Sequence, residues 1–102
     1  MSVEVHPLES EYRAFSPASA ALADRAKKVF PGGDPRASAH YLPYPLSIVK
    51  AQGCTITDAD GHQILDFMNN FTSLVHGHAH SDIVAAVQAQ VALGSAYAAP
   101  SD

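Results

Sequence analysis

Three histidines alternate with small residues in the second half of this chain, at His76, His78 and His80. On a β-strand, this spacing would place three imidazoles on one face, an arrangement that a zinc or iron site can use. Gly77 interrupts the run, and a helix-type pattern begins directly after it, so the three rings are not expected to share a face. The pattern therefore favours an irregular loop without a metal, and elemental analysis of the purified protein would test the metal alternative.

Arg36 is the one cation in the stretch from Gly32 to Pro45, which contains two glycines and three prolines. Glycine and proline at this density exclude regular secondary structure and predict a fixed, extended path. The planar guanidinium of an arginine matches a carboxylate, so Arg36 is a candidate anion clamp. Without further context, the residues favour the alternative of a solvent-exposed loop arginine.

Three aspartates, Asp58, Asp60 and Asp66, lack the spacing of a calcium-binding loop and are interpreted as turn formers and an edge carboxylate. Cys54 has no intrachain partner for a disulfide, and its place in a predicted strand favours a small core residue over a nucleophile. The sequence has no G-x-G-x-x-G, P-loop, G-x-S-x-G or C-x-x-C motif. Short catalytic motifs therefore identify no catalytic residue in this chain.

A small antiparallel sheet is the element predicted to position these residues. Asp60-Gly61 predicts a tight turn between a strand from Cys54 to Ala59 and a strand from Gln63 to Met68 with one buried face. Leu46 to Ala51 is apolar and β-branched and predicts a third strand. Strands this close in sequence pair antiparallel, because a parallel pair needs a long crossover.

Helices are predicted on both sides of this sheet. One extends from Leu8 to Phe15, and a second extends from Ser16 to Phe30, with Ser16 as its N-cap. The second helix is the expected cover for one face of the sheet. Residues 1–7 have no periodicity and are expected to form a flexible arm.

The last predicted helix begins at Ser81, which is its expected N-cap, and ends at Gly94. An apolar stripe along this helix is expected to be buried, and it comprises Ile83, Val84, Val87 and Val91. Between the sheet and this helix, Asn69 to His80 has no period and carries amide, hydroxyl and imidazole groups. Loops of this kind on a rigid scaffold commonly bind ligands, so this loop is the candidate binding site.

The composition is that of a globular protein, with 47% hydrophobic and 16% charged residues. A formal net charge of -4 with six lysines and arginines gives no basic stripe for nucleic acid. No apolar run is long enough for a transmembrane helix, and no signal peptide is recognisable, so neither a membrane nor a nucleic acid is an expected partner. We expect a cytoplasmic location.

Short motifs also follow one another in a definite order. They are Phe30-Pro31-Gly32-Gly33, Asp58-Ala59-Asp60-Gly61, Leu65-Asp66-Phe67, Gly77-His78-Ala79-His80 and Ala98-Ala99-Pro100. In this order, residues 8–102 resemble the N-terminal region of class III aminotransferases, the pyridoxal-phosphate enzymes that include glutamate-1-semialdehyde aminomutase. Ser81 stands where that family usually has proline. The run from Arg36 to Leu46 is most similar to the branch that acts on β-amino acids such as β-phenylalanine.

The resemblance implies roles that the residues alone do not. It implies that Arg36 binds the substrate carboxylate, so the clamp interpretation moves ahead of the exposed arginine. Phe71, Thr72, Val75 and His76 fall in the loop that lines the family's substrate pocket. The fold implied is α+β, with N-terminal helices, a small antiparallel sheet and a following helix, as the N-terminal segment of an aspartate aminotransferase-like fold. Pyridoxal 5′-phosphate (PLP) as cofactor and a homodimer are implied as well.

The chemistry of such an enzyme also needs groups that this chain lacks. Transamination requires a lysine that holds PLP as a Schiff base, and Lys27, Lys28 and Lys50 match none of the family's positions. The family's phosphate-binding turn would fall just beyond Asp102. Residues 8–102 are therefore expected to supply part of the small domain, the substrate-pocket loop and the start of the large domain. The catalytic large domain is expected to be absent from this chain, which should be inactive alone.

The predicted function of the complete enzyme is amino-group transfer between an amino acid, with β-amino acids as a candidate class, and a keto acid. One alternative is an aminomutase or racemase with the same cofactor, which would not consume a keto-acid acceptor. A second alternative is a stand-alone binding or dimerisation module that has no catalytic activity. The coding sequence after Asp102 would discriminate between the module and the enzyme.

Overall fold

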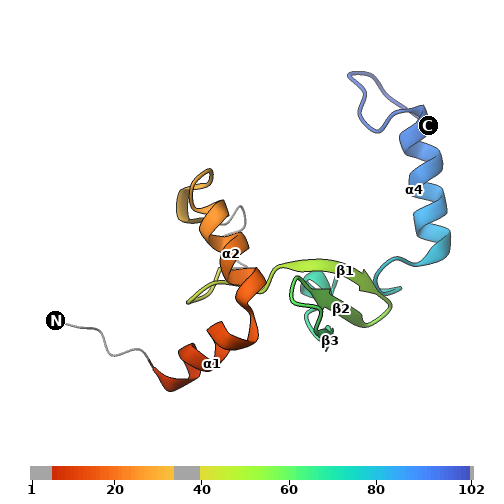
Figure 1. Ribbon diagram of the computed structural model, residues 1–102. Coiled ribbons are helices and arrows are strands. Elements are labelled where there is room, and N and C mark those ends of the chain that lie inside the picture. The colour runs from red at the N-terminus through yellow and green to blue at the C-terminus, as the bar shows by residue number, and fades with distance from the viewer. Residues whose placement is uncertain (1–5, 34–39, 102) are drawn as a thin grey trace.

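A three-stranded antiparallel sheet lies between two helical regions in the computed structural model, which describes residues 6–33 and 40–101 (Figure 1). The helices on the N-terminal side are α1 (Pro7–Phe15) and α2 (Pro17–Ala26), followed by the short 3₁₀ helix η1 (Pro31–Gly33). The remaining elements are β1 (Ile48–Gln52), β2 (Thr55–Asp58), β3 (Gln63–Leu65), α3 (Asn69–Thr72) and α4 (Ser81–Leu93). The predicted α+β class is confirmed.

The sheet has the order β1-β2-β3, and both connections are hairpins, as predicted. Ala51, Ile56 and Ile64 are in register across the strands on one face of the sheet. The opposite face is polar and carries Lys50, Gln52, Thr55, Thr57 and Gln63 around a shallow groove. Alternation of apolar and polar residues is the sequence pattern that selects this register.

The third strand is shorter than predicted, because it ends at Leu65 instead of Met68. The cause is Asp66, whose carboxylate accepts hydrogen bonds from the backbone N–H groups of Met68 and Asn69. Such a local bond gives the backbone an alternative to the sheet ladder. The predicted buried face of this strand is also wrong at its end, since Phe67 is 91% exposed.

The helix that was predicted from Ser16 to Phe30 ends at Ala26. After it, Lys28 and Val29 donate to the carbonyls of Arg25 and Ala26, three residues back, so the chain tightens into turns. Gly32 then adopts a positive φ of 74°, which suits glycine and turns the chain away.

The expected cap of α2 is also corrected. The hydroxyl of Ser16 donates to the carbonyl of Tyr12 in α1 instead of capping its own helix. The cap comes from Asp60 in the β2–β3 turn, whose carboxylate accepts from the N–H groups of Ala18 at 2.7 Å and Ser19 at 3.2 Å. A carboxylate at a helix N-terminus satisfies free N–H groups and interacts favourably with the helix dipole.

Three further helix ends lie within one residue of their predicted positions. Helix α1 begins at Pro7, because the ring nitrogen Nδ1 of His6 accepts from the N–H of Leu8. Helix α4 has His80 as its N-cap instead of Ser81, and it ends at Gly94 as predicted. Residues 1–5 of the predicted flexible arm lie outside the described residues.

Three polar residues and one tyrosine fill the buried joint between the helices and the sheet. Among the described residues, the buried ones are Ser16, Ser19, Tyr44 and Asp58. The Tyr44 hydroxyl lies 3.1 Å from the Ser16 hydroxyl, and the Ser19 hydroxyl accepts from the N–H of Ser47. We call these four residues the polar joint.

Apolar stripes are present but uncovered. The predicted buried stripe of α4 is exposed, with 54% of Val87 and 59% of Val91 accessible to solvent. Nor does α2 cover the sheet as predicted, since Val49 and Leu65 are exposed. The described residues extend over 61 × 30 × 21 Å with a radius of gyration of 17.8 Å, against about 13 Å for a compact domain of this length. Packing within the described chain therefore does not bury these faces.

Within residues 6–33 and 40–101, none of the helices is long and apolar enough to cross a bilayer.

Candidate functional site

The loop from Asp66 to His78 is closed at its base by backbone hydrogen bonds to the β1–β2 turn. Gly53 and His78 exchange N–H···O bonds of 2.8 and 2.9 Å, and the N–H of Asp66 donates to the carbonyl of Cys54. Gly77 makes this approach possible, because a Cβ at that position would lie 2.8 Å from the Gly53 carbonyl oxygen. The loop is therefore attached to the sheet at both of its ends, as a binding loop on a scaffold must be.

Asp66 and His78 join these two ends through their side chains. The Nε2 of His78 lies 2.6 Å from Oδ2 of Asp66, and both side chains are mostly buried, at 20% and 10% exposure. The other carboxylate oxygen, Oδ1, accepts from the N–H groups of Met68 and Asn69 at 2.9 Å each. The hydrogen bond from His78, followed by that from the Asn69 backbone, holds the pKa of Asp66 below its usual range.

The loop contains one turn of left-handed helix, α3, where only irregular structure was predicted. Asn69, Asn70, Phe71 and Thr72 have φ values of 48°, 48°, 57° and 65°. The turn is closed by the N–H of Ser73, which donates to the carbonyl of Asn69. A left-handed turn costs about 1 to 2 kcal/mol for each residue with a Cβ. Backbone strain of this kind is typical of ligand-binding and switch regions.

The predicted substrate-contacting residues separate into two groups in this loop. Val75 and His76 line an open cavity of about 480 Å³ together with Asp66 and the β1–β2 turn. Phe71 and Thr72 lie on the left-handed turn and are exposed, and neither lines that cavity. Arg36, the predicted carboxylate clamp, lies outside the described residues.

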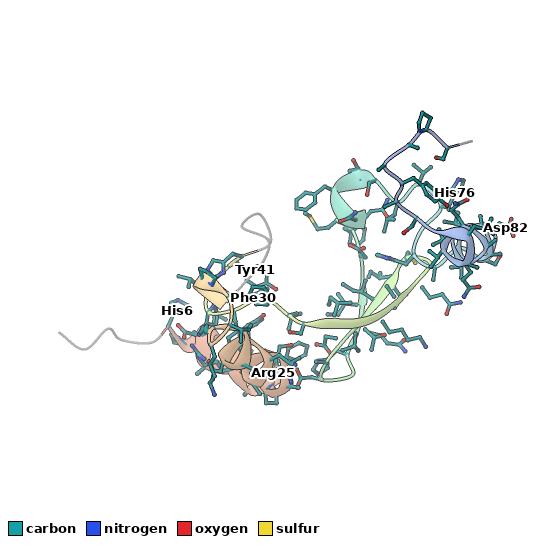
Figure 2. All side chains as sticks on the ribbon, turned by 90° about the horizontal axis from the view of Figure 1, so that it is seen from above. His6, Arg25, Phe30, Tyr41, His76 and Asp82 are labelled. Atoms are coloured by element: carbon teal, nitrogen blue, oxygen red, sulfur yellow. The ribbon has the colours of Figure 1, made fainter. Side chains whose placement is uncertain are left out.

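The described residues place this loop and the segment around Tyr41 at different ends of the molecule. Figure 2 shows His76 and Asp82 at one end, while Phe30 and Tyr41 lie at the other end with α2. Figure 1 shows the same separation of α2 from α4 across the sheet.

The alternating histidines do not converge. His78 is paired with Asp66, whereas the rings of His76 and His80 face each other with centroids 5.4 Å apart. Within the described parts of the chain, no group of three His, Cys, Asp or Glu side chains is placed to hold a metal ion.

Sequence reasoning missed the pairing of Asp66 with His78 and misplaced Cys54. The sequence pattern predicts an edge carboxylate at Asp66 and groups His78 with the other histidines. No short-range pattern connects residues 12 apart across an irregular loop, although each lies in one of the motifs described above. Cys54 was expected in the core of a strand, but it lies exposed in the turn after β1 because Gly53 ends the strand pairing there.

A second aspartate–histidine pair connects Asp58 of the polar joint to His62, away from the loop. Oδ2 of Asp58 is 2.8 Å from Nδ1 of His62, and Oδ1 accepts from the N–H groups of His62 and Asp60. Burial acts to raise the pKa of Asp58, but the hydrogen bonds from His62 outweigh it and leave that pKa below its usual value. The His62 ring also stacks on Phe15 at a centroid distance of 3.8 Å. This pair connects the hairpin to α1.

Comparison with known proteins places the loop and its surroundings in one family. The model of the family "Aminotransferase class-III" matches residues 36–99. The chain is 45% identical over 78 residues to glutamate-1-semialdehyde 2,1-aminomutase of Desulfotalea psychrophila, covering 74% of this chain and 18% of that one. It is 36% identical over 83 residues to β-phenylalanine transaminase of Variovorax paradoxus, covering 78% and 19%.

A solved structure agrees with these matches. A transaminase with PLP bound superposes with a TM-score of 0.81 at 42% identity, over 84% of this chain and 20% of that chain. The chain spans about a fifth of the length of the curated relatives it matches. The family model covers more than half of the chain, and the structural match covers 84% of it, so this chain belongs to the class III aminotransferases.

Proposed function

We propose that these residues are the N-terminal segment of a PLP-dependent aminotransferase that moves an amino group between an amino acid and a keto acid. The observation that supports this most directly is the match of the class III family model to residues 36–99, which include the whole binding loop. The similarity to β-phenylalanine transaminase favours β-amino acids as the first donors to test.

In this proposal, the loop contributes part of a substrate pocket. Val75 and His76 border the cavity, and Phe71 and Thr72 present a ring and a hydroxyl from a turn with a fixed backbone. A pocket for an amino acid needs apolar surface for the side chain and a cation for the carboxylate. We assign the first role to Phe71, Thr72, Val75 and His76. We assign the second role to Arg36 of the other copy in a homodimer, because Phe30 and Tyr41, on either side of it in the sequence, lie at the opposite end of this segment from His76 (Figure 2).

The described residues do not form a site that could hold PLP by themselves. The cofactor, when bound to a lysine amine, supplies the electron sink for amino-group transfer. Lys27 and Lys28 follow α2, and Lys50 lies on the polar face of the sheet, so no lysine borders the loop cavity. We therefore assign the cofactor-binding lysine to protein outside these 102 residues, and no catalytic residue to this segment.

The test uses the complete enzyme that contains this segment. Purified enzyme is supplied with β-phenylalanine or an α-amino acid, with and without a keto-acid acceptor, and both products are quantified. Consumption of the acceptor in step with the donor is the expected result. An enzyme that holds no PLP, or a coding sequence that ends after Asp102, would contradict the proposal and favour a non-catalytic module.

A second candidate, an aminomutase, is favoured by the 45% identity to the Desulfotalea psychrophila protein. An aminomutase moves the amino group within one molecule, so its product forms at the same rate without an added acceptor. We also propose a homodimer, which light scattering of the complete enzyme would test.

A further inference from the structure

We propose that Asp66 and His78 are positioning residues, which act as a clasp that holds the substrate loop in one conformation and so determines discrimination between substrate side chains. This inference rests on the proposed function, in which the loop between them contacts the substrate. Neither residue is assigned a contact with the substrate.

The clasp acts on both ends of the loop at once. His78 is fixed by its backbone pairing with Gly53, and its ring meets Asp66 at 2.6 Å across the loop base. Asp66 is fixed by its own N–H bond to Cys54. The backbone of Asp66 is thus anchored on the sheet side.

The same carboxylate also holds the start of the strained turn. Its Oδ1 atom accepts from Met68 and Asn69, and Asn69 is the first residue with a positive φ. If the His78 ring is removed, Oδ2 loses its partner and the carboxylate is free to rotate away from both amides. The left-handed turn then loses bonds that offset its strain.

Packing does not replace this clasp in the described residues. Phe71 is exposed, Val75 is 85% exposed, and Leu74 is half-buried. A loop with so little buried apolar surface depends on its polar bonds for a single conformation. The orientation of Phe71 and Val75 toward a substrate therefore depends on the Asp66–His78 pair at the base of the loop.

The chain contains a matched control, because Asp58 of the polar joint forms a pair of the same chemistry with His62. The experiment compares His78→Gln with His62→Gln in the complete enzyme, using an aromatic and a small aliphatic amino donor. We expect His78→Gln to reduce the ratio of kcat/KM between the two donors about tenfold, chiefly through KM. His62→Gln should leave the ratio unchanged, although it also lowers thermal stability.

A conservative series separates positioning from simple loss of structure. Asp66→Asn keeps an acceptor for the two amides and a polar group facing His78, so we expect it to retain the wild-type ratio within about threefold. Asp66→Ala removes every one of these bonds and should behave like His78→Gln. Equal ratios in Asp66→Asn and Asp66→Ala would overturn the proposal.

Hydrogen exchange gives a readout that does not need activity. Amides in residues 67–77 should exchange faster in His78→Gln than in His62→Gln, while those in residues 55–65 should not. Unchanged exchange in residues 67–77 overturns the proposal whatever the kinetics, and so does faster exchange with an unchanged donor ratio. A wild-type enzyme that transaminates no donor would instead refute the proposed function and the substrate role of the loop, and exchange alone would then show whether the clasp holds the loop.

Discussion

The carboxylate of Asp60 accepts a hydrogen bond of 2.7 Å from the N–H of Ala18, so a turn of the sheet caps a helix that is 42 residues earlier in the chain. This contact, with its neighbour at Ser19, does what a local N-cap side chain does in most helices. It also fixes α2 to the hairpin without an apolar interface.

Removing this cap should weaken the joint between α2 and the sheet. We expect Asp60→Ala to lower the free energy of unfolding by about 1 kcal/mol, as N-cap removal usually does. Urea unfolding of the complete protein measures the change, and hydrogen exchange in residues 17–26 locates it. Asp24→Ala is the control, because Asp24 lies on α2 in an exposed ion pair with Lys27 and should cost almost nothing. Equal effects of the two variants would refute the capping role.

Substitution of Gly77 should disturb the loop base. Its φ is 75°, and an added Cβ would lie 2.8 Å from the backbone oxygen of Gly53, which is held by His78. We expect Gly77→Ala to destabilise the loop by more than the cost of about 1 to 2 kcal/mol for a left-handed residue. Gly53→Ala has a similar φ of 57° but open space around the new Cβ, so it should show the conformational cost alone. Hydrogen exchange in residues 67–77 compares the two, and an equal rise would argue against the steric contact.

Acid should open the loop through Asp66. Its folded pKa is lowered, first by His78, so the folded state binds fewer protons there than the unfolded state. Its contribution to stability is therefore fully present above the unfolded pKa of about 3.9 and is lost as the pH falls through the lower folded pKa. We expect protection of the Met68 and Asn69 amides to decline below about pH 4 in the wild type, with a flatter decline in Asp66→Asn. Parallel pH profiles would contradict the assignment.

The carboxylate clamp is tested by its selectivity. Arg36→Ala should lower kcat/KM for amino acids by about tenfold or more, because a charge-assisted pair is lost, and should change kcat/KM for amines without a carboxylate far less. Arg25→Ala, an exposed arginine of α2, is the control. Steady-state kinetics with both donor types measures the difference. Equal losses for acids and amines would remove Arg36 from the substrate site.

Local sequence signals predicted turns and helix ends correctly where residues adjacent in the sequence determine the backbone conformation. The turn at Asp60-Gly61 forms as expected, with φ of 92° at Gly61, and Gly94 ends α4. The terminal residues of strand β3 were not predictable, because side-chain bonds from Asp66 compete there with the sheet ladder.

Contacts between distant residues could not be predicted from local patterns. The sequence has no feature that assigns the α2 cap to Asp60 in place of Ser16, since any nearby carboxylate satisfies the same N–H groups. Likewise, the apolar stripe of α4 predicted burial, but a stripe records only that a helix has an apolar face and not which protein covers it. The resemblance to a family supplied the proposed substrate role of the loop, which periodicity alone left open.

The elongated arrangement has a consequence for how this segment would respond to heat when expressed by itself. Its parts are connected by the polar joint at one end of the sheet and by the Asp66–His78 clasp at the other, and the described residues form no shared apolar interior between them. Cooperative melting depends on such an interior, because it makes the loss of one contact weaken all the others. The isolated segment should therefore melt gradually and in sections, without one sharp transition, and its valine-rich helix should bind a fluorescent apolar dye even at low temperature.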